Sequence, residues 1–208
     1  MITFILHTCD DYEFCWKGSL HYLDKHFKEP MPRLFCNEEK DVDLPEGWNQ
    51  FKTGKGAWSD RLKIILDSVT TKYVVYCQED FWPFRKLKIE YLVEAMNGVM
   101  NHNIAAMYLC KLDFNHCSLE PIKYTCHHGF NPLSNYIHNH QFAIWNKEAL
   151  LSNLGGGESP WTNEIAGTQR VKQRGDYYLY MATNFNWYNA VVRHGVMNEI
   201  GIQMLKEI

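Results

Sequence analysis

The chain has 208 residues, of which 46% are hydrophobic and 22% are charged, and its formal net charge is −3. This composition is typical of a globular protein with one sizeable core and excludes an intrinsically disordered chain. The basic residues are scattered singly or in pairs, which argues against a broad surface for binding nucleic acid or an anionic membrane.

The amino-terminal run MITFILHTCDDY lacks the basic residues and the small-residue cleavage site of a signal peptide. The apolar runs are also shorter than the roughly 20 residues that cross a bilayer, so we expect no membrane insertion. Seven cysteines without framework-like spacing are typical of small buried thiols in a reducing compartment. We therefore expect a cytoplasmic protein.

The first part of the chain alternates predicted strands and helices. A β-rich run, Ile2–Thr8, precedes a helix over about 11–27, and a second strand is expected at Arg33–Cys36. An acidic loop over 37–47 is expected to be solvated. Ser59 can cap the next helix, whose apolar residues recur at helical spacing.

The alternation continues through the middle of the chain. We expect strands at Tyr73–Cys77 and Ala105–Leu109, with a helix at about 88–100 between them. Residues 113–140 have no regular pattern. Because strands and helices alternate, the sequence predicts an α/β fold with a mixed, mostly parallel sheet flanked by helices in a single domain.

The last part of the chain is less regular. It begins with a strand at Gln141–Trp145 and a short helix at Asn146–Leu151. The loop GGGESPWTNE, a further helix and a strand at Tyr177–Tyr180 follow, and then a strand or loop surrounds His194.

Two of the predicted strands end in paired carboxylates. Asp10 and Asp11 follow the first strand, and Glu79 and Asp80 follow the apolar run YVVYC. Ligands of open α/β sheets bind outside the carboxyl ends of the strands, so these four acids are expected at one edge. Their mutual repulsion calls for a cation, and oxygen ligands favour Mn²⁺ or Mg²⁺ over zinc.

The order of the motifs WSDRL, YVVYCQED, QFAIWNK and WTNE resembles that of small glycosyltransferases of the GT-A type, and covers the chain except residues 113–140. It is similar in particular to glycosyltransferase domains of chlorella-virus capsid-glycan proteins. The resemblance implies a GT-A-like (Rossmann-like) fold, with a nucleotide-binding half over about 1–110 and an acceptor-binding half over about 111–208. It also implies transfer of a sugar, such as glucose or a deoxyhexose like rhamnose, from a UDP-sugar to a glycan or glycoprotein acceptor, and so suggests capsid glycosylation in a host cytoplasm.

The same resemblance assigns roles in nucleotide-sugar and metal binding. Gln78 stands where the family's metal motif begins with Asp, so Asp80 is expected to be the remaining direct ligand and His194 a second one. Glu79 would assist or contact the ribose. The other expected donor-binding residues, for uracil, ribose and diphosphate, are Thr8, Asp10, Asp11 and Arg61.

The resemblance also implies a general base if the reaction inverts the anomeric centre. Glu164 in PWTNE stands at the usual place, and Glu158 is the alternative. Trp161 would offer an apolar face to the acceptor sugar.

Simpler structural interpretations remain open for each of these residues. Asp10 and Asp11 could only cap a helix, and Glu79 and Asp80 could be loop acids before a turn. The remaining candidates could be ordinary surface or core residues: Arg61, Trp161, Glu164 and His194.

Two other functions also remain open, a non-catalytic sugar-binding module and a nucleotidyltransferase that forms sugar nucleotides. The nucleotidyltransferase would need a glycine-rich phosphate loop after the first strand, and CDDYEF supplies none. A zinc site between Cys110 and His128 is disfavoured because the spacing lacks the usual ligand pairs.

Overall fold

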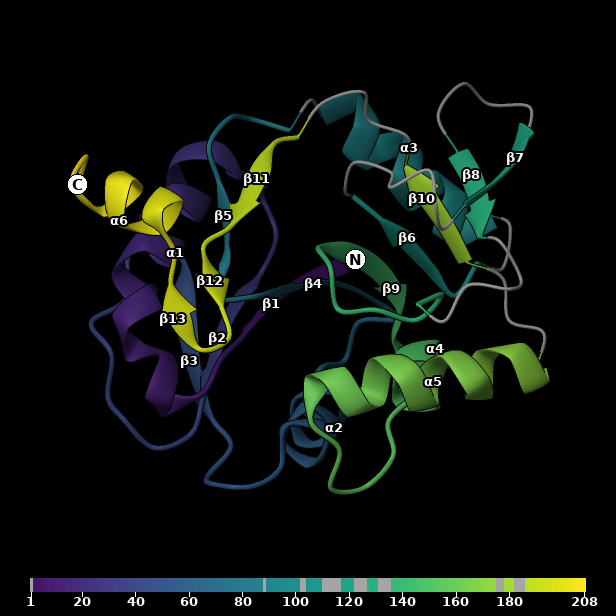
Figure 1. Ribbon diagram of the computed structural model, residues 1–208, viewed down its shortest axis with the longest axis horizontal. Helices are drawn as coiled ribbons and strands as arrows, with labels where there is room; N and C mark the ends of the chain where they lie inside the picture. Colours follow the sequence, from purple (N-terminus) through teal and green to yellow (C-terminus); the bar gives the residue numbers. More distant parts are fainter. Residues whose placement is uncertain are drawn as a thin grey trace.

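The computed structural model describes residues 2–87, 89–101, 104–109, 117–121, 127–130, 136–174, 178–181 and 186–208. Within these residues the main sheet has nine strands in the order β3-β2-β1-β4-β9-β6-β10-β8-β7 (Figure 1). The strands of this sheet are β1 (Ile2–His7), β2 (Arg33–Asn37), β3 (Trp48–Lys52), β4 (Tyr73–Gln78), β6 (Ala106–Tyr108), β7 (Cys117–Pro121), β8 (His127–Phe130), β9 (Ala143–Asn146) and β10 (Tyr178–Met181).

The sheet is mixed and mostly parallel, which confirms the predicted fold class. β1 pairs in parallel with both β2 and β4, and β6 pairs in parallel with β10. β9 lies antiparallel between β4 and β6. The two halves of the sheet are therefore joined through one reversed strand.

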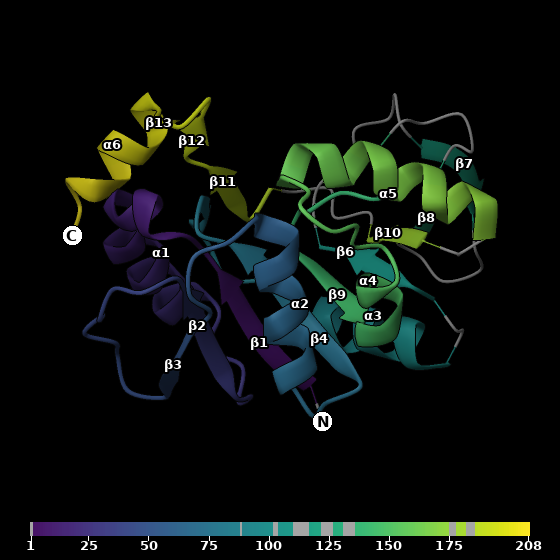
Figure 2. The same ribbon diagram turned by 90° about the horizontal axis from the view of Figure 1, so that it is seen from below.

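Helices cover both faces of the sheet (Figure 2). Side chains alternate between the faces along a strand, so Phe4 and Leu6 of β1 face one core, formed with α1 and α3, while Ile5 faces the other, formed with α2, α4 and α5. The last helix, α6, packs against α1 through Met204. The helical segments are η1 (Asp10–Tyr12), α1 (Glu13–His26), α2 (Trp58–Ser68), α3 (Ile89–Asn101), α4 (Lys147–Leu151), α5 (Pro160–Arg174) and α6 (Glu199–Leu205). No helix in the described part of the chain is long and apolar enough to span a bilayer.

Three predictions of local structure were wrong. Residues 113–140 were expected to be irregular, yet β7 and β8 lie there and extend the sheet. Ser59 does not cap α2, because the cap residue is Ala57 and the buried Ser59 hydroxyl instead accepts a hydrogen bond from the backbone N–H of Glu158 at 2.9 Å. The loop around Trp161 was expected to precede a helix, but α5 already begins at Pro160.

A short ribbon outside the main sheet had no counterpart in the prediction. β5 (Phe81–Pro83) directly follows Asp80 and pairs antiparallel with β11 (Tyr188–Ala190). Gly18 of α1 allows the helix to lie against this ribbon, because a Cβ there would come within 2.1 Å of the Trp82 ring. The hairpin of β12 (Val192–Arg193) and β13 (Val196–Met197) follows.

Candidate active site

The carboxyl ends of β1 and β4 meet at one edge of the sheet, as predicted. The two strands run in parallel register, with His7 opposite Gln78, so the residues that follow them come together. A cavity of about 400 Å³ lies at this edge, and its lining includes residues at the start of α5 and in β11. Figure 2 shows the backbones of these two elements near the end of β1. Seven of the predicted site residues line it: Thr8, Arg61, Gln78, Glu79, Asp80, Trp161 and Glu164.

Glu79 and Asp80 form a buried acidic pair in this cavity. Burial, and then the charge of Asp80, raise the pKa of Glu79 to about 8. Burial likewise raises the pKa of Asp80 to about 6, and the nearby Glu164 adds to the rise. Oδ1 of Asp80 is buried and accepts no hydrogen bond from any described residue. The pair is therefore poised to bind a cation or protons.

Arg61 provides the opposite charge in the same cavity. Its side chain is only 4% exposed, and Nη1 donates to the backbone oxygen of Thr8 at 2.7 Å. Nε donates to the backbone oxygen of Gly56 at 3.3 Å and lies 3.6 Å from Oε1 of Glu38. These contacts fix the guanidinium through Nε and Nη1, and none of them involves Nη2. Arg61 is thus a buried, oriented cation and not a solvated helix residue.

Glu164 lies in the first turns of α5 and also lines the cavity. Its Oε1 accepts a hydrogen bond from the backbone N–H of His140 at 3.0 Å. Burial raises the pKa of Glu164, although this bond offsets part of the rise. One turn earlier, Trp161 is 66% exposed at the rim, so it is not the core residue of the simpler interpretation.

Asp10 and Asp11 do not line the cavity. The Asp10 carboxylate accepts hydrogen bonds from the backbone N–H groups of Glu39 and Lys40, both at 3.0 Å, and from Nδ2 of Asn37 at 2.9 Å. Burial alone would raise the pKa of Asp10, but these bonds lower it. Asp10 therefore holds the loop after β2, and Asp11 is exposed to solvent.

Glu158, the alternative base, also lies outside the cavity lining. Its carboxylate forms a bidentate ion pair with Arg170, at 2.9 and 2.8 Å, and accepts a bond from the backbone N–H of Gly155. Partial burial would raise the pKa of Glu158, but the bonds from Arg170 and Asn163 lower it. These contacts give Glu158 a structural role at the start of α5.

His194 stands at the turn of the β12–β13 hairpin and is exposed. Both turn residues have positive φ, 52° at His194 and 76° at Gly195, the geometry of a two-residue type I′ hairpin turn. A Cβ on Gly195 would lie 3.9 Å from the Tyr12 hydroxyl, which lines the cavity. The turn is therefore near the cavity mouth, but His194 is not one of the residues that line it.

Several residues of the cavity wall were missed from the sequence. His7, Trp58 and Gln141 line it together with the predicted residues. His7 is the last residue of a buried strand, where a polar side chain is unusual. This buried polar residue was the only feature of the sequence that indicated a place for His7 in the site.

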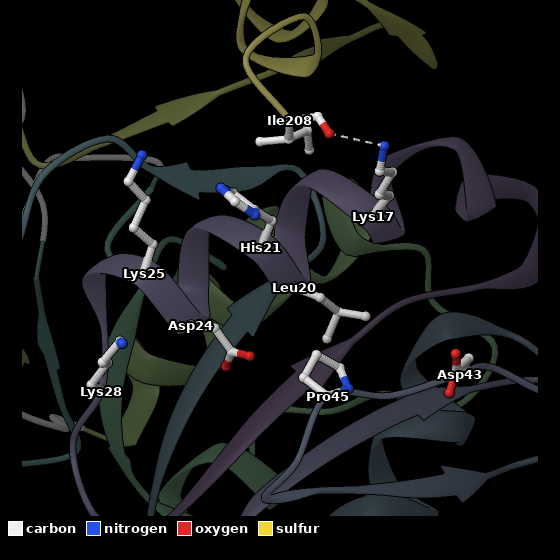
Figure 3. A pocket seen from close by; sticks show the side chains of 9 residues that line it. All are labelled: Lys17, Leu20, His21, Asp24, Lys25, Lys28, Asp43, Pro45 and Ile208. Atoms are coloured by element: carbon white, nitrogen blue, oxygen red, sulfur yellow. Dashed lines mark hydrogen bonds between the residues drawn. The ribbon is translucent and has the colours of Figure 1, made fainter.

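A second hollow, of about 510 Å³, lies along α1 (Figure 3). Lys17, Lys25 and Lys28 surround it, and the wall opposite includes Asp43 and Pro45. Lys17 contacts the backbone oxygen of Ile208 at 3.4 Å. Of the two aspartates that line the hollow, Asp24 forms an ion pair with Arg33 and Asp43 is exposed, so the edge of β1 and β4 is the candidate active site. The segment from Cys110 to Cys126, considered for zinc, lies mostly outside the described residues.

Glu79 is expected to give stability a distinctive pH dependence. Because its pKa is raised from 4.5 to about 8, the folded protein binds this proton more tightly than the unfolded chain does. The resulting stabilisation is complete below pH 4.5 and is lost as the pH rises through about 8. In metal-free buffer, Glu79→Gln should therefore gain melting temperature relative to the wild type, by roughly 8–16 °C between about pH 5 and pH 9, because about three pKa units correspond to about 4 kcal/mol in a chain of this size.

Differential scanning fluorimetry measures this difference, with Glu148→Gln as the control at an exposed glutamate. The buried histidines also make the melting temperature depend on pH, with the opposite sign, because their pKa values are lowered. Their contribution is the same in the variant and the wild type, so it cancels in the difference between the two melting temperatures. A difference that does not change with pH would mean that Glu79 is already ionised in the folded protein.

The sequence matches no protein-family model and no curated protein. Solved structures do match. Residues 1–349 of S. aureus TarS in complex with UDP-GlcNAc superpose with a TM-score of 0.62 at 14% identity, covering 94% of this chain and 60% of that one. The mannosyltransferase PcManGT from Pyrobaculum calidifontis, in complex with GDP-Man and Mn²⁺, gives a TM-score of 0.56 at 13% identity, covering 93% and 58%.

A protein from Desulfovibrio desulfuricans G20, described as a nucleotide-diphospho-sugar transferase, matches with a TM-score of 0.54 at 10% identity, covering 86% of this chain and 79% of that one. This chain spans about three fifths of the TarS 1–349 and PcManGT chains. What these proteins share with it is the GT-A fold, which confirms the fold that the order of motifs implied.

Proposed function

We propose that this protein is a metal-dependent glycosyltransferase that moves a sugar from a UDP-sugar to a hydroxyl group of a glycan acceptor. The observation that carries the proposal is the meeting of Arg61, Asp80 and Glu164 in one cavity. They supply a cation for a diphosphate, a carboxylate whose buried Oδ1 accepts no hydrogen bond from the described residues, and a carboxylate with a raised pKa that can accept a proton. TarS with UDP-GlcNAc and PcManGT with GDP-Man and Mn²⁺ support a nucleotide-sugar donor.

A divalent cation fits the acidic pair. Asp80 would hold it through the buried Oδ1, with Glu79 beside it, because carboxylate oxygens suit Mn²⁺ and Mg²⁺. No group of three His, Cys, Asp or Glu ligands exists among the residues described, and ions of this kind commonly complete their coordination with substrate phosphates. When bound, such an ion offsets the negative charge that develops on the leaving diphosphate. We leave His194 out of the proposed ligand set because it does not line the cavity.

Arg61 would bind the diphosphate in the same cavity. Thr8 and Gly56 fix its guanidinium through their backbone oxygens, so little side-chain freedom is lost when a phosphate oxygen binds at Nη2. A rigid, buried cation of this kind stabilises charge that grows during bond breaking more strongly than a mobile surface lysine does.

Glu164 would act as the general base. The His140 N–H holds Oε1, which leaves Oε2 to take the proton of the acceptor hydroxyl. The acceptor oxygen then bonds to the anomeric carbon as the bond from that carbon to the diphosphate oxygen breaks, and UDP leaves. This displacement inverts the anomeric centre. Trp161 at the rim would support the ring of the acceptor sugar.

The motif resemblance suggests glucose or a deoxyhexose such as rhamnose as the transferred sugar. It also suggests a glycan of a viral capsid glycoprotein as the acceptor. Both are part of the proposal and follow from the order of the motifs alone.

Isothermal titration tests the nucleotide class directly. We expect Mn²⁺ to tighten UDP binding by about tenfold or more, because an ion held by Asp80 and Glu79 would offset the repulsion between these acids and the diphosphate. A screen of UDP-sugars that measures released UDP then identifies the donor. A sugar-binding module would bind free glycan without any Mn²⁺-dependent affinity for UDP, and a nucleotidyltransferase would release pyrophosphate from UTP and a sugar phosphate. Either result would overturn the proposal.

A further inference from the structure

Three buried polar atoms lie on neighbouring rings at the cavity: His7 and Trp58 line it, and His140 packs against Trp58. They are Nε2 of His7, Nε1 of Trp58 and Nδ1 of His140, and none has a hydrogen-bond partner in the part of the chain that the structure describes. The Trp58 ring centroid lies 5.7 Å from that of His7 and 4.3 Å from that of His140. His7 is only 1% exposed, yet it lines the cavity together with Trp58. Unpaired buried polar atoms cost stability, so three in one place call for an explanation.

The hydrogen bonds around these rings show which atoms can donate. Nδ2 of Asn163 donates to the backbone oxygen of Asn153 at 2.8 Å and to the Glu158 carboxylate, and these acceptors fix the orientation of its amide. Oδ1 of Asn163 must therefore accept the bond from Nε2 of His140 at 2.9 Å. The proton of His140 is then on Nε2, and its Nδ1 is an acceptor.

The rings thus bring together a donor on Trp58 and an acceptor on His140, with Nε2 of His7 able to take either role. The indole N–H of Trp58 can only donate. Burial raises the pKa of Tyr76, and the nearby N–H of Trp58 offsets part of this rise. The contact between Trp58 and Tyr76 does not reach hydrogen-bond geometry, so Nε1 of Trp58 has no partner among the described residues. Nδ1 of His7 shares a hydrogen bond of 3.2 Å with Tyr76, which leaves Nε2 for a ligand. The ligand group that complements such a wall is one that both donates and accepts, which is a hydroxyl group.

The position of the wall indicates which part of a donor would meet it. The Trp58 ring packs against that of His140 at an interplanar angle of 58°, and the backbone N–H of His140 donates to Glu164. A general base must lie within hydrogen-bond reach of the hydroxyl that attacks the anomeric carbon. If Glu164 is the base, the transferred sugar would occupy the part of the cavity that Glu164 shares with this wall, and the nucleotide would lie at the far end of the diphosphate.

We propose that His7 and Trp58, with His140 behind them, form the subsite that binds the hydroxyl groups of the transferred sugar. This inference rests on the proposed function and names the residues that select the donor. A site built to pair a hydroxyl group rejects an analogue that lacks it, because the protein atoms would remain unpaired. The subsite therefore favours a fully hydroxylated hexose such as glucose over a deoxyhexose.

Two conservative variants test the subsite by isothermal titration with Mn²⁺. Trp58→Phe removes the N–H and keeps an aromatic ring, and His7→Asn keeps a polar atom near Tyr76 and removes Nε2. Each variant and the wild type are titrated with UDP, UDP-glucose, UDP-galactose and UDP-GlcNAc. We expect about tenfold weaker binding of the preferred UDP-sugar in each variant, with UDP affinity unchanged within about twofold. Trp48→Phe is the matched control, since its indole N–H donates to Asp24 outside the cavity.

The other outcomes overturn the subsite. Equal losses for UDP and the UDP-sugar would mean that the wall binds the nucleotide. Unchanged affinities with a lowered melting temperature would mean that the three rings are only structural. If Trp58→Phe fails to fold, the result for His7→Asn tests the subsite alone, because this variant keeps the contact between the Trp58 and His140 rings. Failure of the proposed function looks different, since the wild type itself would then bind neither UDP nor any UDP-sugar.

Discussion

Glu164→Gln is expected to lower kcat by about 10²–10⁴-fold while leaving the affinity for UDP and Mn²⁺ unchanged. The amide keeps the size of the side chain and the bond from the His140 N–H, but it cannot take a proton from the acceptor. Released UDP measured with donor and acceptor gives kcat, and titration gives the affinity. Because the raised pKa of Glu164 belongs to the base, the rate of the wild type should fall at low pH as this carboxylate becomes protonated.

Glu158→Gln is the matched comparison, because the sequence alone could not choose between the two glutamates. Its ion pair with Arg170 is partly buried, so the variant should lose melting temperature while kcat stays within about tenfold of the wild type. A large fall in kcat for Glu158→Gln, with little change for Glu164→Gln, would reverse the assignment of the base.

Asp80→Asn is expected to abolish the Mn²⁺-dependent part of UDP binding and to lower kcat/KM by about 10²-fold or more. The amide has nearly the shape of the carboxylate, so the cavity is preserved while the negative charge is lost. Removing a buried carboxylate whose Oδ1 has no described partner should also maintain or raise the melting temperature of the metal-free protein. Loss of function with retained stability separates a ligand role from misfolding.

Asp67→Asn on the exposed side of α2 is the control for this experiment. If Asp80→Asn bound UDP with the same Mn²⁺ dependence as the wild type, the cation would lie elsewhere and the proposed arrangement of the site would be wrong.

The sequence was most informative where the physical cause is local. Apolar periodicity identified β1, β4 and α2, because burying one face of a strand or helix leaves a repeating pattern. The meeting of the ends of β1 and β4 then followed from the rule that parallel strands share a carboxyl edge. Of the four acids expected there, Glu79 and Asp80 line the cavity, whereas Asp10 and Asp11 do not.

Contacts between distant segments could not be predicted in the same way. Asp10 resembles a nucleotide ligand in sequence, but it binds backbone N–H groups of the loop after β2, which only the folded chain brings near. The meeting of His7 with His140 depends on the antiparallel insertion of β9 beside β4, which strand patterns do not reveal. Glu38 was assigned to a solvated loop, yet its carboxylate lies beside Arg61.

The pairing of β5 with β11 also affects when the active-site cavity can form during synthesis of the chain. The backbone N–H of Val191 donates to the backbone oxygen of Asp80 at 2.8 Å, and Ala190 supplies part of the cavity wall. A ribosome makes β1, β4 and the acidic pair long before it makes this partner strand. A nascent chain can therefore pair its first strands early. The cavity lacks part of its wall, and Glu79 and Asp80 are exposed to water, until β11 has been synthesised and has paired with β5.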